Sequence, residues 1–348
     1  MPNHEGYIAS AANLRVKAWA KLTERKHRER EGKFLLEGVH LVKEALLAGW
    51  PLECVAYDAG AGVPAELAAW AEADAGVGVG NAGELEEAGQ SADLARSSGA
   101  ARRGPAWIPV SPEVIAKCSQ SETPQPVFAV AMKRAGVADL TREFGMTGRQ
   151  LNDRTSEAGP GRDRKPVGEA GSVAQGNHSS GAAAPMFDPE SALVVVLDGV
   201  QDPGNVGTIV RSAAACGATA VVLGRGTADI CNAKTLRATM GALFHVPVIE
   251  ADLTELLPQA VESGIVVVGT SLQAARSCYE CDFRRGVWLV FGNEGSGMSA
   301  AVSGSVSEHV IIPMTGHAES LNVAMAATVL LFEAQRQRMD ESVAALGS

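Results

Sequence analysis

The chain has 348 residues, 46% of them hydrophobic, and a formal net charge of −10 at pH 7. This length makes two domains the default expectation, and the apolar content is sufficient for buried cores. A net negative charge excludes a protein that is basic over its whole surface, although a local basic patch can still bind RNA.

The cysteines and the apolar runs indicate the cellular compartment and the metal content. The six cysteines are scattered, the first residues contain no apolar signal region, and no apolar run approaches the length of a membrane span. We therefore expect a cytoplasmic protein with reduced thiols and no membrane contact. Cys278 and Cys281 form a C-x-x-C pair, but no second pair or nearby histidine pair completes a zinc site, so we predict no bound metal.

Residues 1–33 are predicted to form a basic N-terminal helix. Ile8, Leu14, Ala18 and Leu22 recur at helical spacing. The segment also carries a group of basic residues, namely Arg15, Lys17, Lys21, Arg25, Lys26, Arg28, Arg30 and Lys33. A solvated amphipathic helix and an RNA contact explain this charge equally well.

Residues 34–138 are predicted to form a small α/β domain. Short β-rich runs alternate with helical patterns, with strands at 34–38, 52–57, 107–110 and 127–132 and helices at 39–48, 65–73 and 112–120. Ser111 is the expected N-cap of the last helix, with Pro112 in its first turn. Residues 89–106 are rich in Ser, Ala, Gly and Arg, which indicates a loop insertion.

Residues 139–190 break this pattern and are predicted to be a disordered linker or insertion. The run 147–185 is rich in Gly, Ser, Ala and Arg, and it offers too little apolar surface to offset the chain entropy lost on folding. An RNA-contacting arm is the alternative, through Arg149, Arg154, Arg162, Arg164 and Lys165. Asp153, Glu157 and Asp163 dilute that charge, which favours the linker.

Residues 191–348 alternate apolar strands with helices. The strands are expected at 193–197, 220–223, 265–269, 287–291 and 310–312, and the helices at 205–216, 234–240, 254–263 and 319–338. Fully apolar strands between helices predict a mostly parallel sheet covered on both faces. Loops rich in Gly, Ser, Asn and Glu follow the last two strands, at the edge where such sheets bind ligands.

Three segments in this region resemble the motifs of the SpoU (TrmH-type) RNA ribose methyltransferases of the SPOUT superfamily. They are Asn205 six residues before Arg211, then Gly-Asn-Glu-Gly-Ser-Gly at 292–297, and then Ile-Pro-Met-Thr-Gly at 312–316 with Ser-Leu-Asn-Val at 320–323. The resemblance covers roughly residues 193–338. It implies a C-terminal α/β domain with a deep trefoil knot, a rare exception to the rule against knots.

The N-terminal part resembles, more loosely, the L30e-like substrate-binding domain that precedes the catalytic domain in many of these enzymes. The likeness lies in Phe-Leu-Leu-Glu-Gly at 34–38 and in Ser-Glu-Thr-Pro-Gln at 121–125. Pro126 stands where the family usually has glycine, and it stiffens the turn.

The resemblance implies S-adenosylmethionine as the methyl donor, held mainly by backbone groups of the loops. Carried over by position, the donor-binding residues are Gly292, Ile312 and Leu321, with Thr270, Ser271 and Leu272 along the adenosine pocket. A glycine at 292 lets the backbone approach the ligand closely. The glycines at 292–297 do not have the G-x-G-x-x-G spacing and do not follow a first strand, so we reject a nicotinamide-binding fingerprint.

The implied catalytic residues are Asn205, Arg211, Glu294, Ser320 and Asn322. An arginine is a poor base because its pKa is above about 12, so we expect Arg211 to bind RNA phosphate and steady the developing alkoxide. Asn205 is expected to orient the ribose or the arginine, or to cap its helix. Glu294 would hold Arg211 or nearby helix termini, and Ser320 and Asn322 would orient the substrate or the loop.

The sequence therefore predicts an S-adenosylmethionine-dependent RNA 2′-O-ribose methyltransferase, acting on 23S rRNA. The resemblance also implies a homodimer through the knot region. Two alternatives stay open at this point: a tRNA ribose 2′-O-methyltransferase, and a non-catalytic RNA-binding or ribosome-assembly factor with the same fold.

Overall fold

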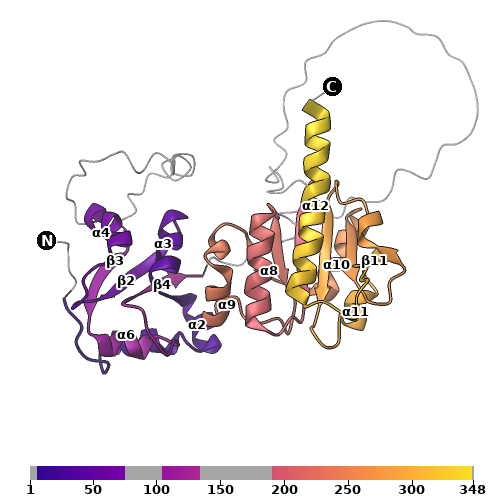
Figure 1. Cartoon of the computed structure of the whole chain (residues 1–348). Helices are drawn as coiled ribbons and strands as arrows, with labels where there is room; N and C mark the ends of the chain where they lie inside the picture. Colours follow the sequence, from indigo (N-terminus) through magenta and orange to yellow (C-terminus); the bar gives the residue numbers. More distant parts are fainter. Residues whose placement is uncertain (1–5, 75–103, 134–189, 347–348) are drawn as a thin grey trace, which may run out of the picture.

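The computed structural model describes residues 6–74, 104–133 and 190–346, with side chains of the last range described as far as Met339. Most of the predicted loop insertion at 89–106 and nearly all of the predicted linker at 139–190 lie outside these residues. The described chain contains two sheets, one in the N-terminal part and one in the C-terminal part (Figure 1).

The N-terminal sheet has four strands in the order β1-β4-β2-β3. The strands are β1 (Lys33–Glu37), β2 (Leu52–Asp58), β3 (Ala106–Val110) and β4 (Val127–Met132). β4 runs antiparallel to β1 and β2, and only β2 and β3 are parallel. One face packs on α3 (Val39–Leu47) and α4 (Ala68–Asp74), and the other on α1 (Leu14–Lys21) and α6 (Pro112–Cys118).

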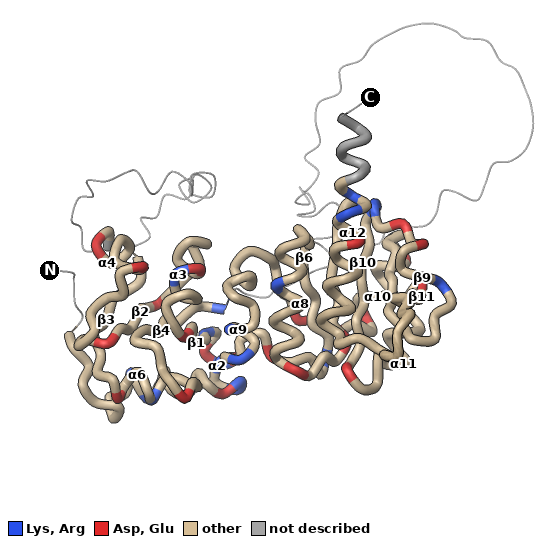
Figure 2. Tube along the Cα trace, viewed as in Figure 1, with Lys and Arg blue, Asp and Glu red and all other residues tan. Residues whose placement is uncertain are grey.

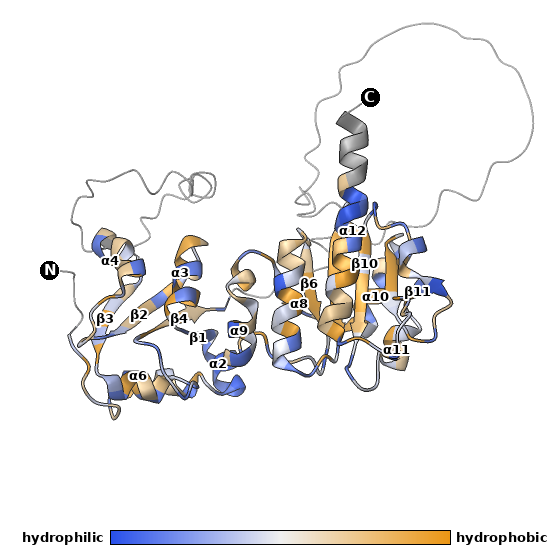
Figure 3. Cartoon of the chain, viewed as in Figure 1, coloured by the Kyte–Doolittle hydropathy of each residue, from blue (hydrophilic) through white to orange (hydrophobic). Residues whose placement is uncertain are grey.

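The N-terminal segment forms two helices rather than the single predicted helix. α1 ends at Lys21 and α2 (Arg25–Glu31) follows after a short break. Arg28 explains the break, because its Nη1 donates to the carbonyls of Leu22 and Thr23 at 2.9 and 2.6 Å. An uninterrupted helix would have used these carbonyls for its own ladder. Figure 3 shows α2 as a hydrophilic segment.

The C-terminal sheet has seven strands in the order β7-β6-β5-β10-β8-β11-β9, and every neighbouring pair is parallel. The strands are β5 (Leu193–Asp198), β6 (Ala220–Leu223), β7 (Val248–Glu250), β8 (Val266–Thr270), β9 (Arg276–Ser277), β10 (Val287–Gly292) and β11 (Glu308–Ile311). The predicted parallel α/β fold is confirmed, whereas the trefoil knot stays a prediction. The short strands β7 and β9 were not predicted.

Helices cover both faces of this sheet, and the alternation of side chains along β5 shows which helix lies on which face. Leu193, Val195 and Leu197 pack with α8 (Pro203–Ala215) and α12 (Val323–Leu346). Val194 and Val196 pack with α10 (Leu253–Glu262) and α11 (Ala300–Ser303). The central strands β5, β6 and β10 consist almost entirely of apolar residues, as burial on both faces requires. Figure 3 shows β6 and β10 as hydrophobic.

The helix after β5 begins at Pro203 and not at the predicted Asn205, because Asp202 is its N-cap. The terminal helix begins at Val323 and not at 319, since the Asn322 side chain accepts from the backbone N–H groups of Ala324 and Met325. In both places an Asp or Asn side chain satisfies N–H groups that the helix leaves free, and this fixes the start.

All six cysteines are buried free thiols. Burial raises the pKa of the Cys278 and Cys281 thiols, so both stay protonated at neutral pH. Within the described part of the chain, no cluster of three or more His, Cys, Asp or Glu side chains is arranged to hold a metal ion. Over the same residues, no helix combines the length and apolar character needed to cross a bilayer.

Candidate active site

A cavity of about 680 Å³ opens at the carboxyl edge of the C-terminal sheet, beside β8, β10 and β11. Its size is that of a pocket for a small organic ligand, for which about 300–1,000 Å³ is usual. Its walls include the six residues predicted to bind the methyl donor, namely Thr270, Ser271, Leu272, Gly292, Ile312 and Leu321. Glu294, Ser320 and Asn322 also line it.

The parallel arrangement explains why these residues meet. Strands β8, β10 and β11 run the same way, so the loops that leave their carboxyl ends emerge at one edge. Residues 271–273 follow β8, residues 293–298 follow β10, and residues 312–322 lead from β11 to α12. Segments far apart in the sequence therefore form one wall.

The loop after β10 is held in shape by Asn293, which the sequence analysis did not single out. Its Oδ1 accepts from the backbone N–H groups of Gly295 and Ser296 at 2.9 and 3.0 Å. Its Nδ2 donates to the Gly199 carbonyl at 2.8 Å, which ties the loop to the end of β5. An Asn two residues before a glycine is a turn signal that could have revealed this role.

Gly292 is required by the loop itself, which differs from the predicted reason. A Cβ at this position would lie 2.2 Å from both the Gly297 carbonyl carbon and the Met298 nitrogen. These are backbone atoms and cannot turn aside, so no other residue fits without displacing the loop. The glycine therefore closes the wall of the cavity, whether or not a ligand also approaches it.

Glu294 is the centre of a hydrogen-bond cluster. Its carboxylate accepts from the backbone N–H groups of Gln201 and Asp202, both at 3.0 Å, and from Asn205 Nδ2 at 2.9 Å. Burial alone would raise the pKa of Glu294, but these donors outweigh it and lower that pKa. The carboxylate thus stays ionised and joins the loop after β10 to the loop before α8.

Asn322 extends this cluster to the third motif. Its Nδ2 donates to Asn205 Oδ1 at 3.0 Å, while Asn205 Nδ2 donates to Glu294. The three predicted motifs therefore meet in a chain of hydrogen bonds from Asn322 through Asn205 to Glu294. Asn205 does not cap α8, because Asp202 Oδ1 accepts from the Asn205 backbone N–H.

Arg211 lies apart from this cluster in the single chain. It is an exposed residue of α8 and does not line the cavity. Six residues separate it from Asn205, which corresponds to about 9 Å along the helix and to a different face. Within the described ranges it has no hydrogen-bond or ion-pair partner, so the predicted contact with Glu294 is not made.

The fold and the site together define an α/β protein that binds a small molecule at the carboxyl edge of a parallel sheet. Residues 192–332 match the model of the SpoU rRNA Methylase family, and residues 13–129 match that of the MRM3-like substrate binding domain. The chain belongs to the SpoU rRNA methylase family.

Particular relatives resemble either nearly the whole chain or its C-terminal part. The chain is 30% identical over 325 residues to the 23S rRNA (guanosine(2553)-2′-O)-methyltransferase RlmP of Bacillus subtilis, covering 93% of this chain and 97% of that protein. It is 42% identical over 149 residues to the 23S rRNA (guanosine-2′-O-)-methyltransferase RlmB of Xanthomonas campestris, covering 42% and 60%. The crystal structure of the SpoU methyltransferase AviRb from Streptomyces viridochromogenes, in complex with the cofactor AdoMet, matches with a TM-score of 0.65 and 26% identity over 94% of this chain and 98% of that one.

Proposed function

We propose that this protein is an S-adenosylmethionine-dependent RNA 2′-O-ribose methyltransferase that acts on 23S rRNA. The observation that supports it best is the meeting of the three motifs. Asn205, Glu294 and Asn322 form one hydrogen-bonded chain at the rim of a cavity lined by Gly292, Ile312 and Leu321. The chain is 30% identical to a 23S rRNA methyltransferase over 97% of that protein's length, which supports the same conclusion.

The cavity suits S-adenosylmethionine. Its wall combines apolar side chains from Leu272, Ile312 and Leu321 with the main chain of three loops, a surface that suits an adenine ring and its polar edge. The sulfonium of this cofactor would supply an activated methyl group. The role of the protein is then to hold a ribose 2′-oxygen in line with that group and to help its proton leave.

Asn205 is proposed to position the ribose, because hydrogen bonds to Glu294 and Asn322 fix its amide. Glu294 and Asn322 act as positioning residues for this amide and for the loops. Ser320 lies in the cavity wall beside Leu321 and is proposed to orient the substrate. Arg211 is proposed to bind RNA phosphate and to stabilise the developing alkoxide.

Because Arg211 does not line the cavity of its own chain, we propose that a second copy supplies it. α12 exposes Met325, Phe332 and Met339, which are 52%, 49% and 60% accessible and seven residues apart. This spacing forms one apolar stripe on the helix. α8 packs beside α12, with Ser212 Oγ 2.7 Å from Thr328 Oγ1, so Arg211 borders this region. A homodimer through this face would bury the stripe, and light scattering that finds only a monomer would contradict it.

Ribosomal RNA is preferred to tRNA as the substrate because a 23S rRNA enzyme matches over nearly the full length of both chains. A non-catalytic RNA-binding factor would not need to retain Asn205, Glu294 and Asn322 in one hydrogen-bonded cluster. We propose the N-terminal part as an L30e-like unit that binds the RNA, and the cytoplasm as the place of action. The proposed boundaries are 34–138 for that unit and 191–348 for the catalytic domain.

Mapping of ribose methylation in total RNA, from cells with and without the gene, tests this function. One 23S rRNA nucleotide is expected to lose its 2′-O-methyl group when the gene is absent. Titration calorimetry with S-adenosylmethionine is expected to show binding to the purified protein. A lost methyl group in tRNA would support the tRNA alternative, and absence of donor binding would support a non-catalytic factor.

A further inference from the structure

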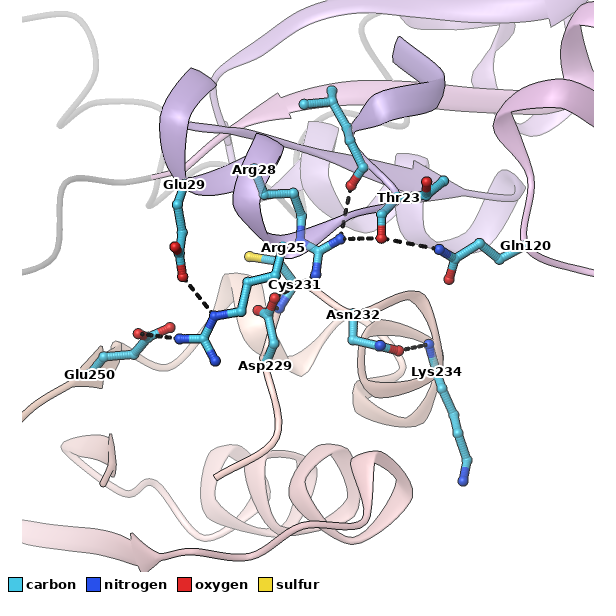
Figure 4. A network of polar contacts seen from close by, with 11 residues as sticks. Thr23, Arg25, Arg28, Glu29, Gln120, Asp229, Cys231, Asn232, Lys234 and Glu250 are labelled. Atoms are coloured by element: carbon cyan, nitrogen blue, oxygen red, sulfur yellow. Dashed lines mark hydrogen bonds and ion pairs between the residues drawn. The ribbon is translucent and has the colours of Figure 1, made fainter. Parts of the chain in front are cut away.

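A buried ion pair holds the N-terminal part against the C-terminal sheet. Arg28 Nη2 lies 2.5 Å from Asp229 Oδ2, and these side chains are only 5% and 10% exposed. Arg25 adds an exposed pair to Glu250 at 3.2 Å (Figure 4). Because a buried pair is costly to break, the surface where the two parts meet has a fixed geometry.

The helix α9 (Ala233–Thr239) lies at this junction and carries two exposed cations one turn apart, Lys234 and Arg237. Their side chains are 60% and 45% exposed. Positions i and i+3 face the same side of a helix, with Cβ atoms about 5–6 Å apart. Figure 2 shows further Lys and Arg positions along the neighbouring α2, where they alternate with glutamates.

Lys234 is anchored to the candidate active site. Its Nζ lies 3.0 Å from Asp202 Oδ2 and lowers the pKa of that carboxyl group. The Asp202 backbone N–H donates to Glu294, and the Asp202 side chain accepts from the Asn205 backbone N–H. The ammonium group therefore lies beside the first turn of α8, next to Asn205.

Arg237 is anchored to the N-terminal part. Its Nη1 lies 3.4 Å from Glu37 Oε2. Glu37 also accepts from Ser119 Oγ at 3.1 Å and from the Gln120 backbone N–H at 2.8 Å. Residues 119–120 begin the exposed loop that contains one of the stretches similar to a substrate-binding domain. Polar contacts thus join α9 to Glu294 through Lys234 and Asp202, and join the same helix to this loop through Arg237 and Glu37.

We propose that Lys234 and Arg237 bind successive phosphates of the RNA strand as it passes from the methylation site to the loop at 119–125. This proposal rests on the proposed function. Asp202 and Glu37 hold the two cations in place before RNA binds. The Lys234–Asp202 pair is exposed and contributes only about 1 kcal/mol or less, so a phosphate can take the place of Asp202. Glu37 is only 11% exposed, so a phosphate would instead meet the outward side of Arg237, whose side chain is 45% exposed.

The competing explanation is that Arg237 and Glu37 only fasten the two parts together. The two explanations predict opposite results for two substitutions. If Arg237 binds phosphate, then R237A weakens RNA binding, whereas E37Q frees the guanidinium, removes a negative charge from the RNA path and tightens binding. If the pair is only a fastening, both substitutions weaken RNA binding and lower the melting temperature together. Gln at 37 keeps one oxygen, which can accept from the Gln120 backbone N–H, and it loses the second acceptor that Ser119 Oγ now uses.

The experiment measures the Kd for an in vitro transcript of unmethylated 23S rRNA over a range of salt concentrations. K234A and R237A are each expected to raise Kd about fivefold and to reduce the slope of log Kd against log salt by about 0.7. Donor affinity should stay as in the unsubstituted protein, because neither residue lines the cavity. E37Q is expected to lower Kd about twofold, because it removes one negative charge beside Arg237.

The matched control is R284A. Arg284 is 53% exposed and paired with Asp282 at 2.8 Å, but it lies at the amino end of β10, away from the site. It should leave Kd and the salt slope unchanged. Equal RNA affinity for R237A and R284A would overturn the proposal, and so would weakened binding by E37Q. If the unsubstituted protein methylates RNA and R237A binds RNA with the same Kd, this inference alone is refuted. If the unsubstituted protein does not bind RNA, the proposed function is refuted as well.

Discussion

Helices pack on both sheets, but the two sheets differ in strand direction, and their edges differ as a result. In the C-terminal sheet all neighbouring pairs are parallel, so loops from β8, β10 and β11 collect at one edge and enclose a cavity. In the N-terminal sheet β4 runs against β1, so the carboxyl end of β1 lies beside the amino end of β4, with Glu37 opposite Phe128. At that edge the end of β1 meets the loop that leads into β4, and Glu37 contacts Arg237 of α9.

At each of these edges, one glutamate holds the neighbouring loop in place by accepting backbone hydrogen bonds. Glu294 accepts from backbone N–H groups before α8, and Glu37 accepts from the backbone N–H of Gln120. Each carboxylate also contacts a polar side chain of the C-terminal part, Asn205 in one case and Arg237 in the other. The comparison suggests that catalysis depends on the first edge and RNA placement on the second, and the predictions below test this division.

The largest effect is expected for Arg211→Ala. It should lower the rate of methyl transfer by about 10²–10³-fold or more, because a cation that stabilises developing charge is removed. Donor affinity should stay nearly unchanged, since Arg211 does not line the cavity. Single-turnover rates and calorimetry measure the two quantities. A large loss of donor affinity would mean that this side chain belongs to the donor pocket.

Mixing two inactive variants tests whether Arg211 acts in the partner's site. Ala326→Trp would fill the donor cavity, whose wall includes Ala326, and Arg211→Ala would remove the arginine. Random pairing makes half of the dimers mixed, each with one intact site, so about a quarter of full activity should return. Each variant alone serves as the control. Mixed dimers that form without regaining activity would place Arg211 in its own chain's site.

Glu294→Gln should reduce methyl transfer by about 10–100-fold, because an amide has one oxygen to accept the bonds that the carboxylate now shares between two. The pKa of Glu294 is lowered in the folded protein. Its stabilising contribution is therefore present above the ordinary glutamate pKa of about 4.3 and is lost as pH falls through the lower folded value.

Melting temperatures of the wild type and of Glu294→Gln, measured against pH, test that sign. The difference between them should be constant near neutral pH and shrink below about pH 4. A difference that grows on acidification would show that burial, which raises the pKa, outweighs the donors.

Two glycines at strand ends compare the two edges directly. Gly292→Ala sets a Cβ against fixed backbone at 2.2 Å and should cost about 3 kcal/mol or more, with loss of donor affinity. Gly38→Ala meets the flexible end of Gln125 at 2.6 Å, and its φ of +93° with ψ of 158° lies in a region essentially restricted to glycine. The substitution should cost about 1–3 kcal/mol and spare the donor site. Urea denaturation measures the free energy of unfolding, and calorimetry measures donor affinity. If both variants lost donor affinity equally, the proposed difference in role between the two edges would be contradicted.

The sequence by itself determined most of the C-terminal strands and their parallel arrangement, and its resemblance to a known family indicated the residues that line the cavity. Apolar runs of strand length between helical patterns and glycine-rich stops are local signals, and a parallel sheet then brings the loop motifs to one edge. The starts of α8 and α12 were missed by two and four residues, because the capping side chains Asp202 and Asn322 decide them.

Only the tertiary structure decided the contacts that give these residues their roles. Asn205 bonds to Glu294 and Asn322 across 89 and 117 positions, and Arg237 meets Glu37 across 200. The break between α1 and α2 depends on Arg28, which is drawn toward Asp229 across 201 positions. Periodicity and propensity describe a residue's near neighbours along the chain, whereas these bonds depend on strand order and on how the two sheets dock.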